Sequence, residues 1–570
     1  MPSIFALSDA ALSTAPTFQI ENELLNRIVN GRVTNQSLFL EFEARQQVVV
    51  EYQNILEGTD LRAAAPCSGI ALSALSLPRT QRQRDTFLFG TRPWIGSPHD
   101  KLRANVRALP RVISPGRISR EIPVDVSDPR RGQRNIGDVR LSNPDGKLDF
   151  LIRDYILPGE KIRAYLGEPS TPSEDWWLIY EAIIDDVEAT RTQIRISVTT
   201  VADELDRPFQ LRQYTGNGKL TGDQNVKGRL KPVALGEIWG AEPVLINAGD
   251  NIYAVNDGPI QGIDWVREGG LDYTFVGDFR DYDSLASATL NAGEYATSLE
   301  NGIFRIGVNL PGLVFPLRVG VLGDNKTGYS AVTGTILYRL ARNRAFLAAD
   351  QVNLSSFNNL PKGKIGYYYT GAQATTVRQV FDDLLGGVNG YYGVGRSDKL
   401  SVGRLLAPEF VLTNLSLRNE QIFNLRVEPR PDENRFVQPF TYQNTASPVT
   451  EDEVSPAANS DVADRLQRPN LEGSESVGGS SGIAPIDQSV LTTYFINLND
   501  AAQIAKQAVQ FSAAQRVPYR ADLGRQGLFL DMGSCVELQS DRFITDYRGI
   551  VYSQEDRLGA TIQTEVTALG

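Results

Sequence analysis

The residue types that most often carry catalysis are scarce in this chain. Its 570 residues include one histidine, His99, and two cysteines, Cys67 and Cys535. A serine or cysteine nucleophile activated by an imidazole would have to use His99. Its neighbours Pro98 and Asp100 lie in an arginine-rich stretch and form no nucleophile elbow. We therefore interpret His99 as a surface or interface residue.

The cysteine count also limits disulfide and metal chemistry. Cys67 and Cys535 lie far apart in the sequence, which excludes a disulfide framework and argues against a single bridge. A zinc site would need mostly carboxylate ligands, an unusual donor set for zinc. We predict neither a metal nor a cofactor.

Paired carboxylates need separate consideration, because a glycosidase requires only two of them. Asp185 and Asp186 are predicted to end a strand that follows Trp176-Trp177, and Glu181 precedes them. Adjacent strand residues point to opposite faces, so the two aspartates cannot converge on one substrate without a bulge. We predict that they are not catalytic.

Three aspartates in the segment GDFRDYDS resemble part of a calcium loop. These are Asp278, Asp281 and Asp283. The glycine and the closing glutamate at the twelfth loop position are missing. Capping of a short helix by Asp283 is the better interpretation.

Glycine-rich and aromatic segments give no stronger signal. The sequence contains neither GxxxxGK[ST] nor GxGxxG between a strand and a helix, so no phosphate cradle is indicated. Residues Gly216 to Gly218 are predicted to form a turn. The tyrosines at 367–369 and 391–392 suggest sugar stacking, but tyrosines on half-exposed strands favour packing. We predict no catalytic, cofactor-binding or metal-binding residue, and hence no enzyme.

The elements around these residues are mostly strands. Between Gly137 and Pro208, Ile194, Ile196 and Val198 alternate with polar residues, as expected for a strand with one buried face. The sequence from Asn143 to Gly146 predicts a tight turn, with Gly146 at positive φ. This pattern is typical of a small antiparallel barrel or sandwich.

We predict a mainly β, multidomain protein with two tube-like β-barrel or sandwich modules, an inserted β-rich module and a few short helices. Helices are expected at 282–292, 374–385 and 499–515, and a hairpin at 390–405. The predicted segments are an N-terminal arm or edge element (1–66), a first β module (67–230), an inserted module (231–350), a second β module (351–442 plus 487–570) and a flexible acidic Ser/Gly/Pro-rich loop (443–486).

Charge and composition narrow the class of protein. A hydrophobic content of 41% excludes wholesale disorder, and a net charge of −11 argues against nucleic-acid binding by the whole chain. Residues 79–140 nevertheless hold thirteen arginines and one lysine against six acidic residues, whereas 443–486 hold seven acidic residues against two arginines. These regions are either a solvated basic face and an acidic loop, or surfaces that meet between subunits.

No segment has the roughly 18 consecutive apolar residues of a membrane span. The N-terminus also lacks a basic start followed by an apolar core and a cleavage site, so no secretory signal is evident. We expect a soluble protein made in the cytoplasm of the cell that produces it.

A series of motifs between about 67 and 345 resembles a family of phage tail proteins from siphophages, Mu-related phages and prophages. The motifs are GDVRLSNPDGKLDFLI, LPGEKIRAYLG, VADELDRP, LTGDQNVKGRLKPVALGEIWGAEPVLIN, IYAVNDGPIQGI and LNAGEYATSLENGIFRIG. From about 374 onward the helix, the GYYGVGRSDKLSVGRL hairpin and the C-terminal elements are similar to hub proteins of tail tips and baseplates. Residues 1–66 fall outside the resemblance, and the two β modules share no obvious sequence repeat.

The resemblance implies a structural virion protein. It implies a homotrimeric hub whose six barrels match a sixfold tail tube, with tail-tube or distal tail protein, tip proteins and fibres as partners, and DNA passing through a central channel. The expected location is the virion tail tip or baseplate, after assembly in the host cytoplasm. Two alternatives remain: a tail-associated enzyme that degrades cell wall or capsule, and a receptor-binding or carbohydrate-binding tail module.

Overall fold

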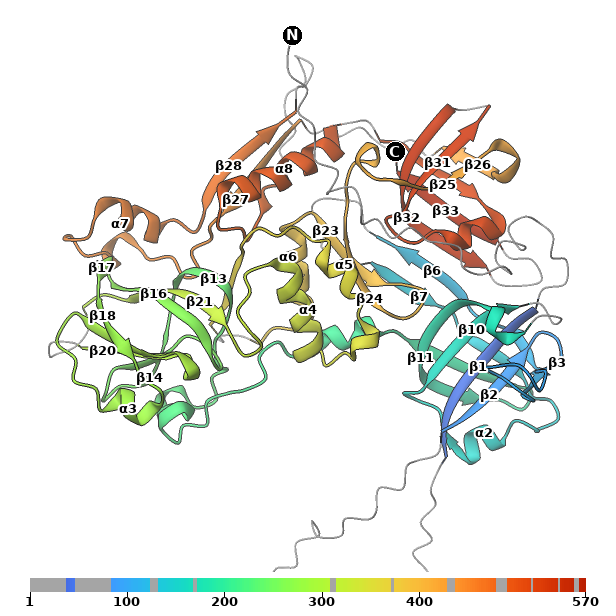
Figure 1. Cartoon of the computed structure of the whole chain (residues 1–570), viewed down its shortest axis with the longest axis horizontal. Helices are drawn as coiled ribbons and strands as arrows, with labels where there is room; N and C mark the ends of the chain where they lie inside the picture. The colour runs from blue at the N-terminus through green and yellow to red at the C-terminus, as the bar shows by residue number, and fades with distance from the viewer. Residues whose placement is uncertain are drawn as a thin grey trace, which may run out of the picture.

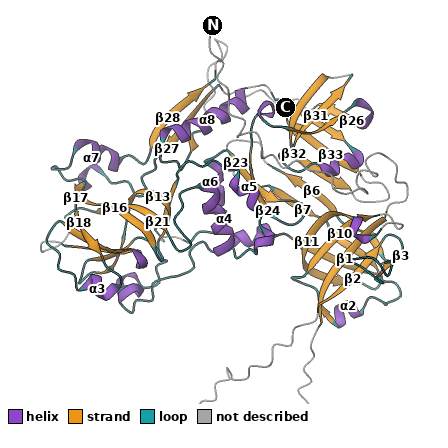
Figure 2. Ribbon diagram, in the orientation of Figure 1, coloured by secondary structure: helices purple, strands orange, loops and turns teal. Residues whose placement is uncertain are grey.

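The computed structural model describes most of the chain. The described residues are 37–46, 84–122, 132–167, 172–307, 314–370, 374–427, 436–477, 489–513, 516–541, 544–557 and 563–569. They form several β-sheets and short helices, which confirms the predicted mainly β, multidomain class (Figure 2). Cys67 lies outside the described residues, as do most of residues 1–66.

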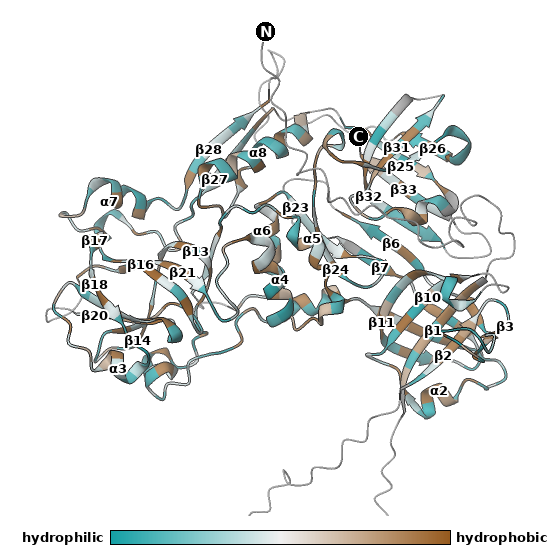
Figure 3. Ribbon diagram, in the orientation of Figure 1, coloured by the Kyte–Doolittle hydropathy of each residue, from teal (hydrophilic) through white to brown (hydrophobic). Residues whose placement is uncertain are grey.

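The first sheet contains ten strands, in the order β3-β4-β2-β1-β10-β11-β12-β8-β5, with β9 paired to β1. Its strands are β1 (Ser37–Gln46), β2 (Arg84–Gly90), β3 (Trp94–Ile95), β4 (Arg107–Pro110), β5 (Val112–Ser114), β8 (Val139–Ser142), β9 (Tyr155–Ile156), β10 (Lys161–Gly167), β11 (Trp177–Ala189) and β12 (Gln193–Thr199), and α2 (Phe150–Arg153) lies beside it. Apolar and polar bands alternate along these strands (Figure 3). Within the described residues, neighbouring strands of this sheet are hydrogen-bonded from β3 at one edge to β5 at the other.

Strand β1 changes the predicted role of the N-terminal segment. Residues 1–66 are predicted to be an arm or edge element, but β1 lies between β10 and β2 in the middle of the first sheet. Phe39 and Phe42 of β1 are almost fully buried, and the Phe39 ring stacks on Trp176 with centroids 4.0 Å apart. The sequence shows that apolar and polar residues alternate along β1. The strands that pair with β1 lie in residues 84–167, and a pattern within one element cannot identify them.

Two five-stranded sheets contain the strands of the segment predicted as the inserted module. The first has the order β17-β16-β21-β13-β22 and the second β14-β15-β20-β19-β18. Their strands are β13 (Val233–Ala241), β14 (Val244–Asn247), β15 (Ile252–Ala254), β16 (Ile260–Glu268), β17 (Leu271–Asp272), β18 (Thr274–Asp278), β19 (Glu294–Ser298), β20 (Ile303–Ile306), β21 (Leu317–Asp324) and β22 (Gly366–Tyr369). Strand β22 lies beyond the predicted limit at 350, so the module extends past it. The helix α3 (Tyr282–Ala286) is shorter than the predicted 282–292.

Helices and short strands lie in the centre of the molecule, between the inserted module and the first and last sheets, and α8 (Leu498–Ala513) lies above them beside β27 (Val437–Tyr442) and β28 (Leu471–Ser476) (Figure 1). The central elements are α4 (Thr333–Asn343), α5 (Leu354–Asn358), α6 (Val377–Gly386), β23 (Gly390–Val394) and β24 (Leu400–Arg404). The two helices and the hairpin predicted in this region are therefore confirmed. One buried cluster joins residues from Val201 to Ala505, so this core is assembled from distant parts of the chain.

The described part of the acidic segment, residues 443–477, is more ordered than predicted. It contains α7 (Ser460–Gln467) and β28 (Leu471–Ser476). In a three-stranded sheet, β28 and β29 (Leu491–Thr492) flank β27 (Val437–Tyr442). The composition suggested a flexible loop because few apolar residues are present, but backbone pairing with β27 orders 471–476.

The last sheet combines strands from both ends of the chain. Its main path is β25-β31-β32-β33-β30-β26, and β6 pairs with both β32 and β7. These strands are β6 (Arg117–Glu121), β7 (Gln133–Ile136), β25 (Thr413–Leu417), β26 (Phe423–Val427), β30 (Pro518–Asp522), β31 (Cys535–Ser540), β32 (Ile544–Arg557) and β33 (Gln563–Leu569). Two strands from the first part of the chain, β6 and β7, therefore belong to the same sheet as the C-terminal strands.

Candidate functional site

The one histidine and the one described cysteine occupy separate, ordinary positions. His99 is exposed in a turn, where its backbone N–H donates to Ser97 Oγ at 3.3 Å. Cys535 is a buried free thiol on β31, and burial raises its pKa. Arg548 Nε donates to the Cys535 sulfur at 3.3 Å. Neither residue forms part of a nucleophile–base arrangement in the described region.

The predicted carboxylate candidates do not form an acid–base pair. The register of β11 against β12 shifts between Ile184 and Asp186, so a bulge does occur at this point. Strand β11 also continues to Ala189, beyond its predicted end. Asp185 and Asp186 are nevertheless both exposed, while Glu181 accepts hydrogen bonds from Lys161 at 2.9 Å and Arg163 at 2.5 Å.

The three aspartates of GDFRDYDS also act separately. Asp281, not Asp283, is the N-cap of α3, because its carboxylate accepts a hydrogen bond from the Ser284 backbone at 2.8 Å. Asp283 lies in the first turn and pairs with Lys219 at 2.8 Å. Asp278 accepts from Thr297 Oγ1. Capping of this helix by an aspartate is thus confirmed, but the cap is Asp281 and not the predicted Asp283.

The tyrosine groups pack and form hydrogen bonds inside the protein. Tyr367 donates to Asp383 and Tyr392 donates to Asp382, each at 2.9 Å, and both rings are buried. Tyr391 donates to the Met532 carbonyl at 3.2 Å. These contacts support packing rather than sugar stacking. The turn predicted at 216–218 is confirmed, since Gly216 and Gly218 have φ of 79° and 85°.

Within the described ranges, no three His, Cys, Asp or Glu side chains gather in a group that could hold a metal ion. Likewise, no helix in the described part of the chain has the length and apolar character needed to cross a membrane. The absence of metal, cofactor and catalytic residues stays a prediction.

The arginine-rich stretch contributes two arginines to a largely buried ionic cluster between the first and last sheets, which we call the arginine junction. It consists of Arg120, Arg134, Arg396, Asp398, Asp531 and Asp556. Arg120 extends from β6 and pairs with Asp531, and it also donates to Gln554 of β32 at 2.6 Å. The three positive charges match the three negative charges, so the junction has no surplus charge to attract an ionic ligand.

The tip of the β23–β24 hairpin lies inside the arginine junction. Asp398 accepts a hydrogen bond from Arg134 Nη1 at 3.0 Å, and Arg134 Nη2 reaches the Glu181 carbonyl of β11 at 2.7 Å. Arg396 pairs with Asp556 of β32 at 2.8 Å, and its carbonyl accepts from the Glu181 backbone at 2.7 Å. One hairpin therefore contacts both the first and the last sheet.

Burial dominates the protonation properties of the arginine junction. It lowers the pKa of Arg134 to about 10, while Asp398 acts in the opposite direction. Burial raises the pKa of Asp398 to about 6, against the opposing effects of Arg134 and the Val201 backbone N–H. Burial likewise lowers the pKa of Arg120, while Asp531 acts in the opposite direction. Apart from Asp531, whose side chain is 43% exposed, the members of the arginine junction are largely removed from water.

Three arginines of the basic stretch thus pair within the chain. Arg103 forms a two-pronged contact with Glu41 at 2.9 and 3.1 Å, and Arg120 and Arg134 belong to the arginine junction. All three side chains are at most 6% exposed. For these residues the interpretation as a solvated face was wrong, and their partners are in the same chain rather than in another subunit.

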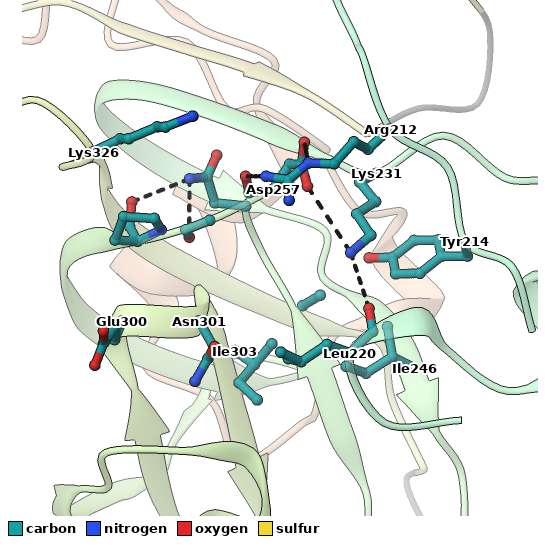
Figure 4. Close-up of a pocket in the computed structure, with 14 residues that line it drawn as sticks. Arg212, Tyr214, Leu220, Lys231, Ile246, Asp257, Glu300, Asn301, Ile303 and Lys326 are labelled. Carbon is teal, nitrogen blue, oxygen red and sulfur yellow. Dashed lines mark hydrogen bonds and ion pairs between the residues drawn. The ribbon is translucent and has the colours of Figure 1, made fainter. Parts of the chain in front are cut away.

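A second feature is a cavity of about 300 Å³ between the inserted module and the segment that precedes it (Figure 4). Its walls come from the segment before β13, the loop after β15, the β19–β20 turn and the residue Lys326 after β21. Gly302 adopts φ of 65°, and a Cβ there would lie 2.3 Å from the Gly258 carbonyl oxygen. This close approach holds two walls of the cavity together.

Asp257 organises the charged wall of this cavity. Arg212 Nε donates to Asp257 Oδ2 at 2.9 Å, and Arg212 Nη2 donates to the Asp257 carbonyl at 2.7 Å. Lys231 Nζ lies 4.0 Å from Asp257 Oδ1 and donates to the Leu220 carbonyl at 2.9 Å. Burial lowers the pKa of Lys231 and raises that of Tyr214. Tyr214 is consequently a neutral phenol at physiological pH.

Sequence reasoning missed both features. Arg134 and Asp398 are separated by 264 positions, and Arg212 and Asp257 by 45. No motif links these residues, because each pair is brought together by strand order rather than by spacing within one element. The only sequence signal for the arginine junction was the excess of arginine between 79 and 140. This excess indicated a positive charge but did not identify the carboxylates that pair with it.

No family model matches the chain, and no curated protein matches it. Among solved structures, the chain is similar to the tail protein from Neisseria meningitidis MC58, with 11% identity, a TM-score of 0.35 and coverage of 80% of this chain and 91% of that one. It is similar to a chain in the virion of a native gene transfer agent particle, with 11% identity, a TM-score of 0.39 and coverage of 60% and 85%. It is also similar to the 43 kDa tail protein of prophage MuSo2 from Shewanella oneidensis, with 10% identity, a TM-score of 0.32 and coverage of 80% and 93%. These three solved structures are thus two tail proteins and a virion component.

Proposed function

We propose that this chain is a structural virion protein and forms the hub of a phage tail tip or baseplate. In this role it caps the tail tube, organises tip proteins and fibres, and surrounds the channel through which DNA passes. The motif series between 67 and 345 supports the proposal through its resemblance to phage tail proteins. The hub has no catalytic activity of its own in this proposal.

The observation that carries the proposal is the connection between the first and last sheets. Strand β6 pairs with β32 over five residue positions, from Arg117 opposite Arg557 to Glu121 opposite Ser553. The arginine junction then joins both sheets to the β23–β24 hairpin. A hub with two β modules in each subunit requires them to be held together, and the pairing of β6 with β32 and the ion pairs of the arginine junction support this.

The charge distribution supports the proposed channel. A net charge of −11 disfavours adhesion of DNA, because phosphate contacts come mainly from lysine and arginine. The buried arginines Arg103, Arg120 and Arg134 are unavailable to DNA because their guanidinium groups already pair with carboxylates. We infer that three copies form the ring, since a trimer with two β modules per subunit matches a sixfold tube.

Light scattering of the purified protein, alone and mixed with tail-tube protein, tests the proposal. We expect the mass of three copies, and electron micrographs should show tubes capped at one end. A protein that stays monomeric and leaves tube ends uncapped would contradict the hub role. Peptidoglycan and capsule zymograms distinguish the enzymatic alternative, which predicts clearing that is lost in an Asp185→Asn or Glu181→Gln variant.

A further inference from the structure

The cavity beside Asp257 contains buried polar atoms without hydrogen-bond partners. Among the described residues, neither Asp257 Oδ1 nor the Tyr214 hydroxyl has a hydrogen-bond partner. Both atoms belong to residues that line the cavity. The Asp257 side chain is 4% exposed, and Tyr214 as a whole residue is 2% exposed. A buried polar atom without a partner costs about 1–3 kcal/mol, so these two atoms favour an occupant that forms hydrogen bonds with them.

The charges around the cavity select against ions. Arg212, Lys231 and Lys326 disfavour a cation, whereas Asp257 and Glu300 disfavour an anion. A purely apolar occupant would leave the Asp257 and Tyr214 atoms unpaired. The remaining class is a neutral molecule with both hydrogen-bond donors and acceptors. Hydroxyl groups meet this requirement, since each one donates to a carboxylate and also accepts from an ammonium or a phenol.

The rest of the lining suits the carbon skeleton of such a molecule. Ile246 and Ile303 are 1% exposed and lie with Leu220 on the side of the cavity opposite Arg212 (Figure 4). An apolar floor with a few polar groups is the usual design of small-molecule sites, and about 300 Å³ lies at the small end of their volumes. One pyranose ring, with one apolar C–H face and hydroxyls at its rim, fits this description.

We propose that this cavity binds a single neutral saccharide residue, with Asp257 accepting from one hydroxyl and Tyr214 bonding to another. The site lies between the inserted module and the segment that precedes it, and its lining includes no member of the arginine junction or of the tyrosine groups at 367–369 and 391–392. It goes beyond the hub role, since it gives the protein a direct contact with glycans.

Saturation-transfer NMR on the full chain tests this site. The probes are D-glucose, D-galactose and N-acetyl-D-glucosamine at millimolar concentration, with D-galacturonate as the charged counterpart. We expect transfer to at least one neutral sugar and none to D-galacturonate. Tyr214→Phe should weaken the binding about threefold to tenfold, the equivalent of one hydrogen bond. Asp257→Asn should weaken it further.

Tyr329→Phe is the matched control, because the Tyr329 hydroxyl is also buried without a partner but does not line this cavity. It should leave sugar binding unchanged. Circular dichroism confirms that each variant is folded, and Tyr214→Phe is the decisive one because no existing hydrogen bond is lost. Failure of all three neutral sugars to bind the folded wild-type protein would overturn the proposal, and so would affinities unchanged by Tyr214→Phe. These results do not depend on oligomeric state, so failure of the sugar site and failure of the hub role are separable.

Discussion

Arg134 and Asp398 form an ion pair of 3.0 Å between residues 264 positions apart, and each side chain is only 3% exposed. The pair connects β7, which continues the last sheet through β6, with the tip of the β23–β24 hairpin in the centre of the molecule. Water is excluded from both partners, so each depends on the other for compensation of its charge. This dependence makes the arginine junction a sensitive point of the fold.

Removal of one partner of this pair should destabilise the protein strongly. We expect Arg134→Ala to lower the free energy of unfolding by roughly 3–5 kcal/mol, because the Asp398 carboxylate stays buried without its partner. Arg153→Ala is the control, since Arg153 pairs with Asp154 on the exposed surface and its loss should change little. Urea unfolding followed by tryptophan fluorescence measures both. Equal effects of the two variants would contradict a buried, structurally important pair.

A replacement of both charges tests the origin of that cost. In Arg134→Met with Asp398→Leu, neither charge remains to be desolvated. We expect this double variant to be more stable than Arg134→Ala, because paired charges in protein interiors are often replaceable by apolar groups of similar size. The same unfolding experiment applies. A double variant that is less stable than Arg134→Ala would show that packing rather than charge dominates at this position.

Asp398 should give stability a specific pH dependence. Its pKa is raised to about 6 by burial, against an ordinary value of about 3.9. Between these values the folded state binds more protons than the unfolded state, so this group favours folding below about pH 4 and loses that contribution as pH rises towards about 6. We expect the stability difference between wild type and Asp398→Asn to change by on the order of 2 kcal/mol across this window. A difference that is constant from pH 4 to 7 would contradict the raised pKa.

Strand β1 should be essential to the first sheet. Phe39 is fully buried and stacks on Trp176, so Phe39→Ala should cost about 3–5 kcal/mol through lost contacts and a cavity. Ile95→Ala is the control at a site that is 67% exposed in the same sheet. Thermal unfolding compares the two. If β1 were a separate arm, Phe39→Ala would leave the main transition unchanged.

The assignment of the α3 cap separates two neighbouring aspartates. Asp281→Ala removes the hydrogen bond to the Ser284 backbone and leaves the first turn without its cap, so it should lower the melting temperature. Asp283→Ala removes only an exposed ion pair with Lys219 and should have a smaller effect. A larger effect of Asp283→Ala would restore the capping role predicted for that residue.

Local pattern in the sequence was enough to determine the class of fold and several elements. The alternation at Ile194, Ile196 and Val198 predicts β12, and the apolar spacing from Val377 to Leu385 predicts α6, because both signals depend on neighbours within one element. The turn at Gly146 follows from the steric freedom of glycine, and its φ is 65°. The prediction that the chain holds no catalytic residues rests mainly on composition, because the sequence has one histidine and two cysteines.

Only the tertiary structure decided which residues meet. The position of β1 inside the first sheet, the extension of β6 into the last sheet and the order at 471–476 all depend on backbone pairing with distant strands. The same is true of Arg134 with Asp398 and of Tyr214 with Asp257, whose proximity has no counterpart in spacing. Sequence periodicity reports which face of an element is apolar, whereas strand order determines which charges and polar groups are buried together.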